Sequence, residues 1–170
     1  MNNELVELDS LDNILIGIHQ AIYTNDDLFK CLQYNSSDAL YQTITDEQKE
    51  QLRNEGNVED CRIYLTPFNN KIISEPRTEL RIYHYRFSPV NDYLMDIVIG
   101  FDIVCHNDLW RLEDSKRRPT TIFQLLLKSL NGLYLESIGE LKLVQSPCNL
   151  IYYNANGFTG YSFYMKTRSS

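Results

Sequence analysis

The segment from Tyr93 to Leu133 constrains the fold more than any other part of the chain. From Met95 to His106 apolar side chains occupy every second position, which is the period of a strand with one buried face. A charged loop follows, and Pro119 is favoured in the first turn of a helix. Apolar residues then recur at helical spacing, namely Ile122, Leu126, Leu130 and Leu133. The segment predicts a central strand, a loop and a helix packed on a sheet.

The N-terminal third of the chain predicts several short helices. Ser10 is placed to cap the first helix and Asn25 the second. Thr45, with Gln48 three residues later, has the pattern of a capping box for a further helix, which Gly56 is expected to end. These amphipathic segments are expected to pack on the sheet.

Further strands are expected on either side of the central strand. A short strand is expected within Cys61–Leu65, and Thr78–Phe87 alternates with high β-propensity. A turn containing Pro89 separates the latter from the central strand, which predicts an antiparallel hairpin. One side of this strand is expected to carry Arg81, Tyr83, Tyr85 and Phe87. The later strands are expected at Leu141–Val144, Leu150–Tyr153 and Thr159–Lys166.

Together these elements predict one α+β domain over residues 1–170. A mainly antiparallel sheet is expected to be packed by one long helix at about residues 119–132, with several short N-terminal helices. Residues 1–56 are expected to form a helical part that packs on an α+β core of residues 61–167. A chain of this length can bury about two thirds of the surface that it exposes when unfolded.

Composition excludes several classes of protein. The aromatic share of 12% and the charged share of 23% are typical of a globular chain rather than a disordered one. A net charge of −7 argues against phosphate-backbone binding as the main task. The N-terminus has no secretory pattern and no apolar run reaches membrane-spanning length, so we expect an intracellular protein without a membrane segment. Its isolated cysteines form no CxxC pair: Cys31, Cys61, Cys105 and Cys148.

Catalytic signatures are missing from the sequence, which contains no Walker loop, GxSxG, HExxH or Gly-rich nucleotide pattern. Asp96 and Asp102 lie about 20 Å apart along one strand, too far to share a proton or a metal ion. The adjacent Cys105 and His106 point to opposite faces, so Cys105 is expected to be a buried structural thiol and His106 to end the strand. We therefore expect no enzyme activity, no metal and no cofactor. A metal-dependent hydrolase using His84 or His106 is a further alternative.

Candidate contact residues lie in two segments. The loop of residues 107–118 has the densest charge, of mixed sign, and tryptophan and arginine are enriched at interface cores. A solvated loop is the other interpretation. Tyrosines recur in the expected strands beyond the needs of one small core, so those left exposed suit a subunit interface. The predicted oligomer or partner interface consists of Trp110, Arg111, Lys116, Arg117, Arg118, Tyr83 and Tyr85.

The central strand, the loop and the last strand together carry a family resemblance. The central strand has Ile99, Phe101, Asp102, Ile103 and His106, an arginine (Arg117 or Arg118) stands near the start of the helix, and a glycine turn leads into Gly160–Met165. With this pattern, residues 78–167 resemble the neck and tail-completion proteins of tailed bacteriophages, particularly the tail-terminator group.

The resemblance implies a structural virion protein without chemistry, assembled in the host cytoplasm. Such proteins form a closed homo-oligomeric ring, usually hexameric, between the tail tube and the head connector, whose proteins are the expected partners. DNA passes through the ring without specific binding, and an acidic chain suits this because like charge prevents adhesion. The alternative is a small regulatory module that binds another protein through the 107–118 loop.

Overall fold

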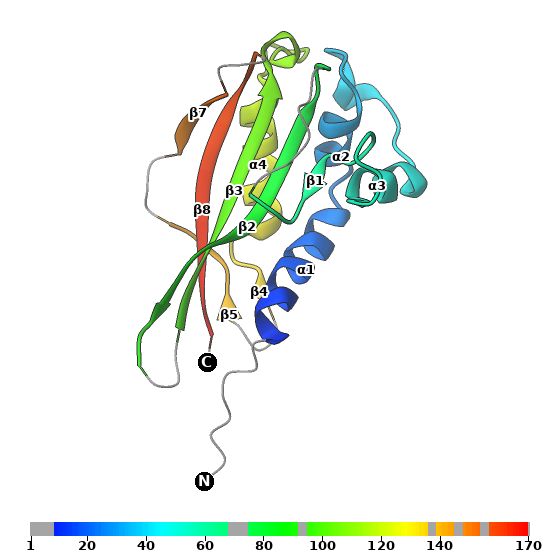
Figure 1. The fold of residues 1–170 in the computed structure, drawn as a ribbon. Coiled ribbons are helices and arrows are strands. Elements are labelled where there is room, and N and C mark those ends of the chain that lie inside the picture. The colour runs from blue at the N-terminus through cyan, green and yellow to red at the C-terminus, as the bar shows by residue number, and fades with distance from the viewer. Residues whose placement is uncertain are drawn as a thin grey trace.

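The computed structural model describes residues 9–67, 75–91, 95–135, 139–144, 148–153 and 157–169. These residues form the expected α+β fold, a twisted and mainly antiparallel sheet with helices on one face (Figure 1). The helices are α1 (Asp9–Tyr23), α2 (Asp26–Gln33), α3 (Asp46–Arg53) and α4 (Arg118–Leu130), with short 3-10 helices η1 (Ala39–Tyr41) and η2 (Asn107–Leu109). The strands are β1 (Ile63–Tyr64), β2 (Thr78–Pro89), β3 (Met95–His106), β4 (Tyr134–Leu135), β5 (Gly139–Glu140), β6 (Lys142–Leu143), β7 (Asn149–Tyr153) and β8 (Phe158–Ser169).

Strand β3 is the centre of the main sheet and spans the residues expected from the sequence. It pairs antiparallel with β2 on one side and with β8 on the other, along its whole length. The predicted β2–β3 hairpin is therefore confirmed. Strand β1 joins the outer edge of β2 in parallel, and β6 and β7 both pair with β8. Strands β4 and β5 form a separate small pair.

Strand β2 contains a bulge. Its pairing with β3 shifts between His84 and Arg86, so Tyr85 is an extra residue in the ladder. Compared with regular alternation, an extra residue turns every following side chain to the opposite face of the sheet. Phe87 consequently lies on the helix-covered face, where its ring is 5.2 Å from that of His84. The expectation that Phe87 shares a side with Tyr83 was wrong, because strict alternation gives no sign of a bulge.

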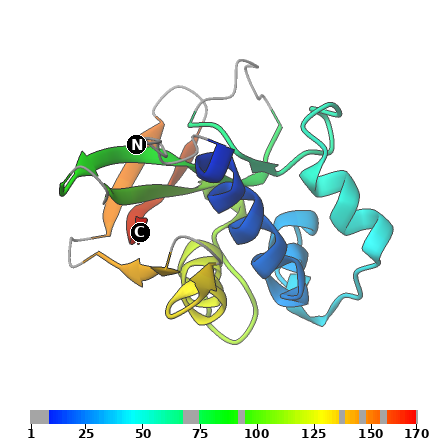
Figure 2. The same ribbon diagram turned by 90° about the horizontal axis from the view of Figure 1, so that it is seen from below.

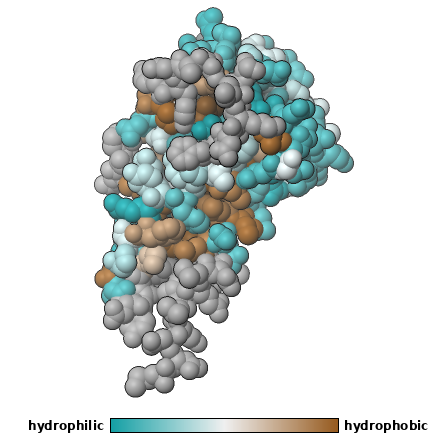
Figure 3. Space-filling model, in the orientation of Figure 1, coloured by the Kyte–Doolittle hydropathy of each residue, from teal (hydrophilic) through white to brown (hydrophobic). Residues whose placement is uncertain are grey.

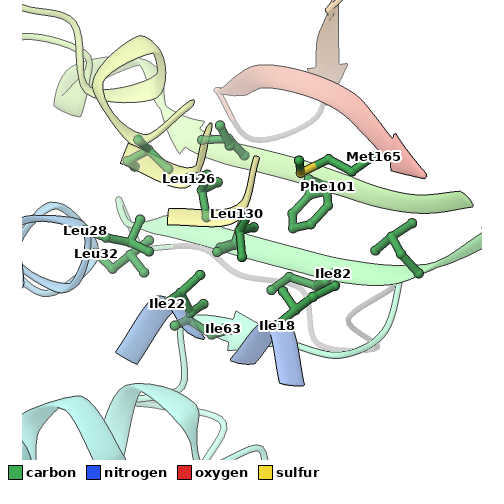
Figure 4. Packing of buried hydrophobic residues seen from close by; sticks show 14 of the residues in the cluster. Ile18, Ile22, Leu28, Leu32, Ile63, Ile82, Phe101, Leu126, Leu130 and Met165 are labelled. Carbon is green, nitrogen blue, oxygen red and sulfur yellow. The ribbon is translucent and has the colours of Figure 1, made fainter. Parts of the chain in front are cut away.

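Helices α1, α2 and α4 lie on the same side of the sheet, as both ribbon views show (Figures 1 and 2). Their apolar faces and the inward faces of β2, β3 and β8 form one buried cluster. In Figure 4 the labelled side chains from helices and strands point toward one another across this interior. Phe163 of β8 stacks on Phe101 of β3 and meets Phe123 of α4 edge-on, both with ring centroids 4.8 Å apart.

The covering layer is not dominated by one long helix. The helix expected at about residues 119–132 corresponds to α4, which has 13 residues, whereas α1 has 15. Both helices bury isoleucine or leucine in the same cluster. The expectation of a single long helix is corrected because the periodic segment before Tyr23 is as strongly apolar on one face as the later one.

Capping explains where the N-terminal helices begin. Asn25 caps α2 as expected, since the backbone N–H of Leu28 donates to its side-chain oxygen at 3.2 Å. The capping box of Thr45 and Gln48 at the start of α3 is also confirmed. Ser10 lies inside α1 rather than at its cap, and α3 ends before Gly56.

Candidate functional site

The predicted contact residues lie in two groups that the fold keeps apart. Tyr83 pairs with Gly100 in the middle of β3, and Tyr85 lies at the bulge farther along the hairpin. Trp110 follows the opposite end of β3, beyond His106. At about 3.3 Å per residue, the six residues from Gly100 to His106 separate the two groups by about 20 Å. The structure therefore presents two candidate surfaces rather than one.

The 107–118 loop is held in a fixed turn. Asp114 and Ser115 both have positive φ, 56° and 59°, at its tip. The backbone N–H of Glu113 donates to the carbonyl oxygen of Ser37 at 2.9 Å, and the hydroxyl of Tyr41 donates to the Asp114 carboxylate. These contacts tie the loop to the segment around η1.

The side chains of this loop differ in their availability. The Trp110 indole N–H donates to the carbonyl oxygen of Cys105 at 3.4 Å, and its ring centroid lies 6.1 Å from that of Tyr161, so this side chain is half-buried. Arg111, Lys116 and Arg117 are exposed. Three of the predicted residues in this loop are thus accessible to a partner.

Arg118 is fully buried, which corrects its assignment to a contact surface. Its guanidinium group donates to four backbone carbonyl oxygens at 2.6–2.8 Å, those of Cys31, Tyr34, Ser36 and Leu109. Burial lowers the pKa of this group from its ordinary value. Buried carbonyl groups need donors, and the planar fork of arginine satisfies several at once. Arg118 therefore joins the end of α2 to the start of α4.

Tyr83 belongs to a buried polar cluster on the outer face of the sheet, the face without helices. The Tyr83 hydroxyl lies 3.2 and 3.3 Å from the two carboxylate oxygens of Asp102, and the Ser162 hydroxyl donates to the same carboxylate at 2.7 Å. Burial raises the pKa of Asp102, while these hydroxyl groups and Arg81 act in the opposite direction. Burial and the neighbouring Asp102 raise the pKa of Tyr83. Tyr83 is thus anchored by its hydroxyl group.

A second polar cluster on the outer face was not predicted from the sequence. Glu79 is completely buried and accepts hydrogen bonds from Arg77 at 2.7 Å and from Arg81 at 3.0 Å. Arg77 also donates to the Tyr64 hydroxyl at 3.2 Å. The signal in the sequence is the alternation Arg77, Glu79, Arg81, which places all three side chains on one face of a strand. Figure 3 views this face and shows hydrophilic and apolar residues interspersed over its described part.

Tyr85 remains accessible at the bulge. Its side chain is 54% exposed, and its ring centroid lies 4.4 Å from that of Tyr164 on β8. Such a tilted aromatic pair adds a rigid apolar surface with polar hydroxyl groups, which suits a protein contact. Of the two predicted tyrosines, Tyr85 is the one that is free to meet a partner.

The histidines do not converge on one site. His84 contacts the carbonyl oxygen of Leu11 at 3.1 Å on the helix-covered face, where burial lowers its pKa. His106 ends β3 and lies 3.5 Å from the Asp108 carboxylate. Cys105 is buried as expected, and burial raises the pKa of its thiol to about 11. Over the described ranges, no three His, Cys, Asp or Glu side chains form a group that could hold a metal ion.

Fold and site together define an α+β protein whose candidate residues lie on the outer sheet face and on the loop after β3. Residues 25–167, from α2 to β8, match the YomW family, and the chain belongs to this family. The family is a phage-derived one, so the protein is phage-related. No curated protein matches the sequence. In the part of the chain that the structure describes, no helix is both long enough and apolar enough to cross a membrane.

Proposed function

We propose that the protein is a structural subunit of a phage particle, and that its copies assemble into a closed ring at the head–tail junction. In this role it is a tail terminator or a neck completion protein that surrounds the DNA channel of the virion. The observation that carries the proposal is the end of the β2–β3 hairpin, where accessible apolar side chains and an open strand edge occur together in a phage-related protein.

The end of β2 and the residue after it expose three large apolar side chains within a few residues of one another. Tyr85, Phe87 and Val90 are 54%, 43% and 47% exposed. In Figure 1 this end of the hairpin projects away from the helices. Apolar side chains exposed along a projecting element are accessible to a partner protein.

Among the described strands, none pairs with the outer edge of β2 over the same residues. Strand β1 pairs with it only at Leu80 and Arg81, and no other described strand pairs with this edge from Ile82 onward. An open edge offers backbone groups to another chain. A neighbour that binds here with a different surface of its own makes a heterologous contact, and repetition of such a contact closes into a ring when the rotation permits.

The charge of the chain suits a channel for DNA. At a net charge of −7 the assembled ring is anionic, so the passing duplex is repelled rather than held.

Light scattering on the purified full chain, combined with negative-stain imaging, tests this proposal. We expect one defined oligomer at high micromolar concentration and annuli with an open centre. Wild-type protein that stays monomeric at that concentration, forms no annuli and does not bind tail tubes or connectors would overturn the ring.

A regulatory module is the second candidate, and the fixed conformation of the 107–118 loop favours it. The loop holds Arg111, Lys116 and Arg117 outward in a defined arrangement. This function predicts that replacing Arg111 and Arg117 with glutamate abolishes partner binding and leaves the oligomeric state of the purified protein unchanged. A loss of assembly in the same variant would contradict it.

A further inference from the structure

A row of cations crosses the outer face of the sheet near the hairpin end. Arg86 of β2 pairs with Val98 of β3, Val98 pairs with Lys166 of β8, and Lys166 pairs with Lys142 of β6. Directly paired residues of antiparallel strands point to the same face with side chains close together, and like charges in such positions repel each other. The fold thus places Lys142 directly opposite Lys166, with Arg86 two strands away in the same row.

The surroundings neutralise this row only in part. In the next row Arg168 forms an ion pair with Asp96 at 2.6 Å, and Arg168, Lys166 and Arg86 together lower the pKa of Asp96. Lys142 forms an ion pair with Glu140 at 2.7 Å. Arg86 and Lys166 are exposed, and neither has an ion pair with a described side chain. We call Arg86, Lys142, Lys166 and Arg168 the cationic patch.

The opposite charge is concentrated in the helical part of the chain. Residues 9–60 contain eleven Asp and Glu against three Lys and Arg, a formal charge of −8, whereas residues 61–170 carry +3. Exposed carboxylates line α3 and the segment after it, and we call this set the acidic patch: Asp46, Glu47, Glu50, Glu55 and Glu59. Both ribbon views place α3 on the side of the molecule away from β7 and β8 (Figures 1 and 2).

The 107–118 loop offers no comparable surplus of charge. Its exposed cations, Arg111, Lys116 and Arg117, are matched in number by Asp108, Glu113 and Asp114. The cationic patch is therefore the better complement for a strongly acidic surface. Tyr85 and Tyr164 adjoin it and supply apolar contact area of the kind found at interface cores.

We infer that the cationic patch of one copy binds the acidic patch of the next copy, head to tail. This inference rests on the proposed function and names the contact through which the ring closes. Because the two patches lie on different sides of one molecule, the contact is heterologous and each copy can make it twice. Complementary charge fixes the register of such a contact and accelerates association.

Charge reversal on each patch tests the inference. The first variant combines Arg86→Glu with Lys166→Glu, and the second combines Glu47→Lys with Glu59→Lys; all four residues are exposed, and none forms an ion pair with a described side chain. We expect each variant alone to lose assembly in sedimentation velocity, with a dissociation constant raised at least about tenfold. An equimolar mixture should assemble again, because both of its alternating contacts then join opposite charges. Circular dichroism and thermal unfolding verify that each variant is folded.

The control variant combines Arg111→Glu with Lys116→Glu, which changes the net charge equally in the 107–118 loop and should leave assembly unchanged. If Arg86→Glu/Lys166→Glu assembles like the wild type, the inferred contact is overturned while the proposed ring stands. If the wild type itself is monomeric, the proposed function is overturned and the inference with it. If the variant assembles normally but loses binding to a short DNA duplex that the wild type binds, the cationic patch is a nucleic-acid surface and the inference is overturned.

Discussion

Asp102 gives the stability of the protein a pH dependence at the level of one residue. Its raised pKa means that the folded state favours the protonated carboxyl group more than the unfolded state does. The stability that this group contributes is complete below its ordinary pKa and is lost as the pH rises through the folded-state pKa. Asp102→Asn cannot ionise and keeps an acceptor for the hydroxyl groups of Tyr83 and Ser162.

We therefore expect the stability of Asp102→Asn, relative to the wild type, to improve between about pH 4 and about pH 8. Urea unfolding at both pH values measures this difference. A difference in the free energy of unfolding that stays constant with pH would contradict a raised pKa.

Arg118 shows how one side chain can join two elements. Lysine keeps the charge but cannot reach the four carbonyl groups that the guanidinium fork satisfies. We expect Arg118→Lys to lower the free energy of unfolding by about 2–4 kcal/mol, because buried acceptors are left without donors. Chemical denaturation measures the loss. Arg117→Lys is the control, since Arg117 is exposed and its side chain, among the described residues, donates to the carbonyl groups of Ser115 and Lys116. Equal stability of the two variants would show that these carbonyl groups do not depend on Arg118.

At the scale of elements, β8 can approach β3 only because it has glycine at position 160. A Cβ atom there would lie 1.6 Å from the carbonyl oxygen of Ile103. Gly160→Ala must push the central pair of strands apart, and we expect it to lose more than about 3 kcal/mol or to fail to fold. Gly56→Ala is the control, because its Cβ would meet only the flexible side chain of Asn54, at 3.1 Å. Thermal unfolding compares the stability of the two variants, and the soluble yield replaces it if one variant aggregates. Equal stability of Gly160→Ala and Gly56→Ala would contradict the close approach of β8 to β3.

Elements specified by local patterns could be predicted from the sequence. The bounds of β3, the β2–β3 hairpin and the capping box of Thr45 depend on neighbours within a few residues, and all are confirmed. The bulge at Tyr85 and the burial of Arg118 could not be predicted, because they depend on groups distant in sequence. The ion network around Glu79 joins residues only two positions apart, and it was missed because the visible alternation does not show that Glu79 is buried.

At the scale of the whole molecule, charge is separated rather than spread evenly. The net charge of −7 suggests a uniformly acidic protein, but the helical part carries the acidic excess and the sheet part is slightly basic. Such an electrical asymmetry supplies the complementary faces that the proposed head-to-tail contact requires. The distribution of charge therefore carries information that the total does not.

The bulge in β2 decides what the projecting arm offers to its surroundings. If Tyr85 instead paired regularly with Val98, without a bulge, alternation would turn Arg86 inward toward the helices and Phe87 outward into water. The outer face of the arm would then be apolar and uncharged at this position, which favours non-specific aggregation. One irregular residue in the ladder thus decides whether the outer face of the arm presents a cation or an aromatic ring.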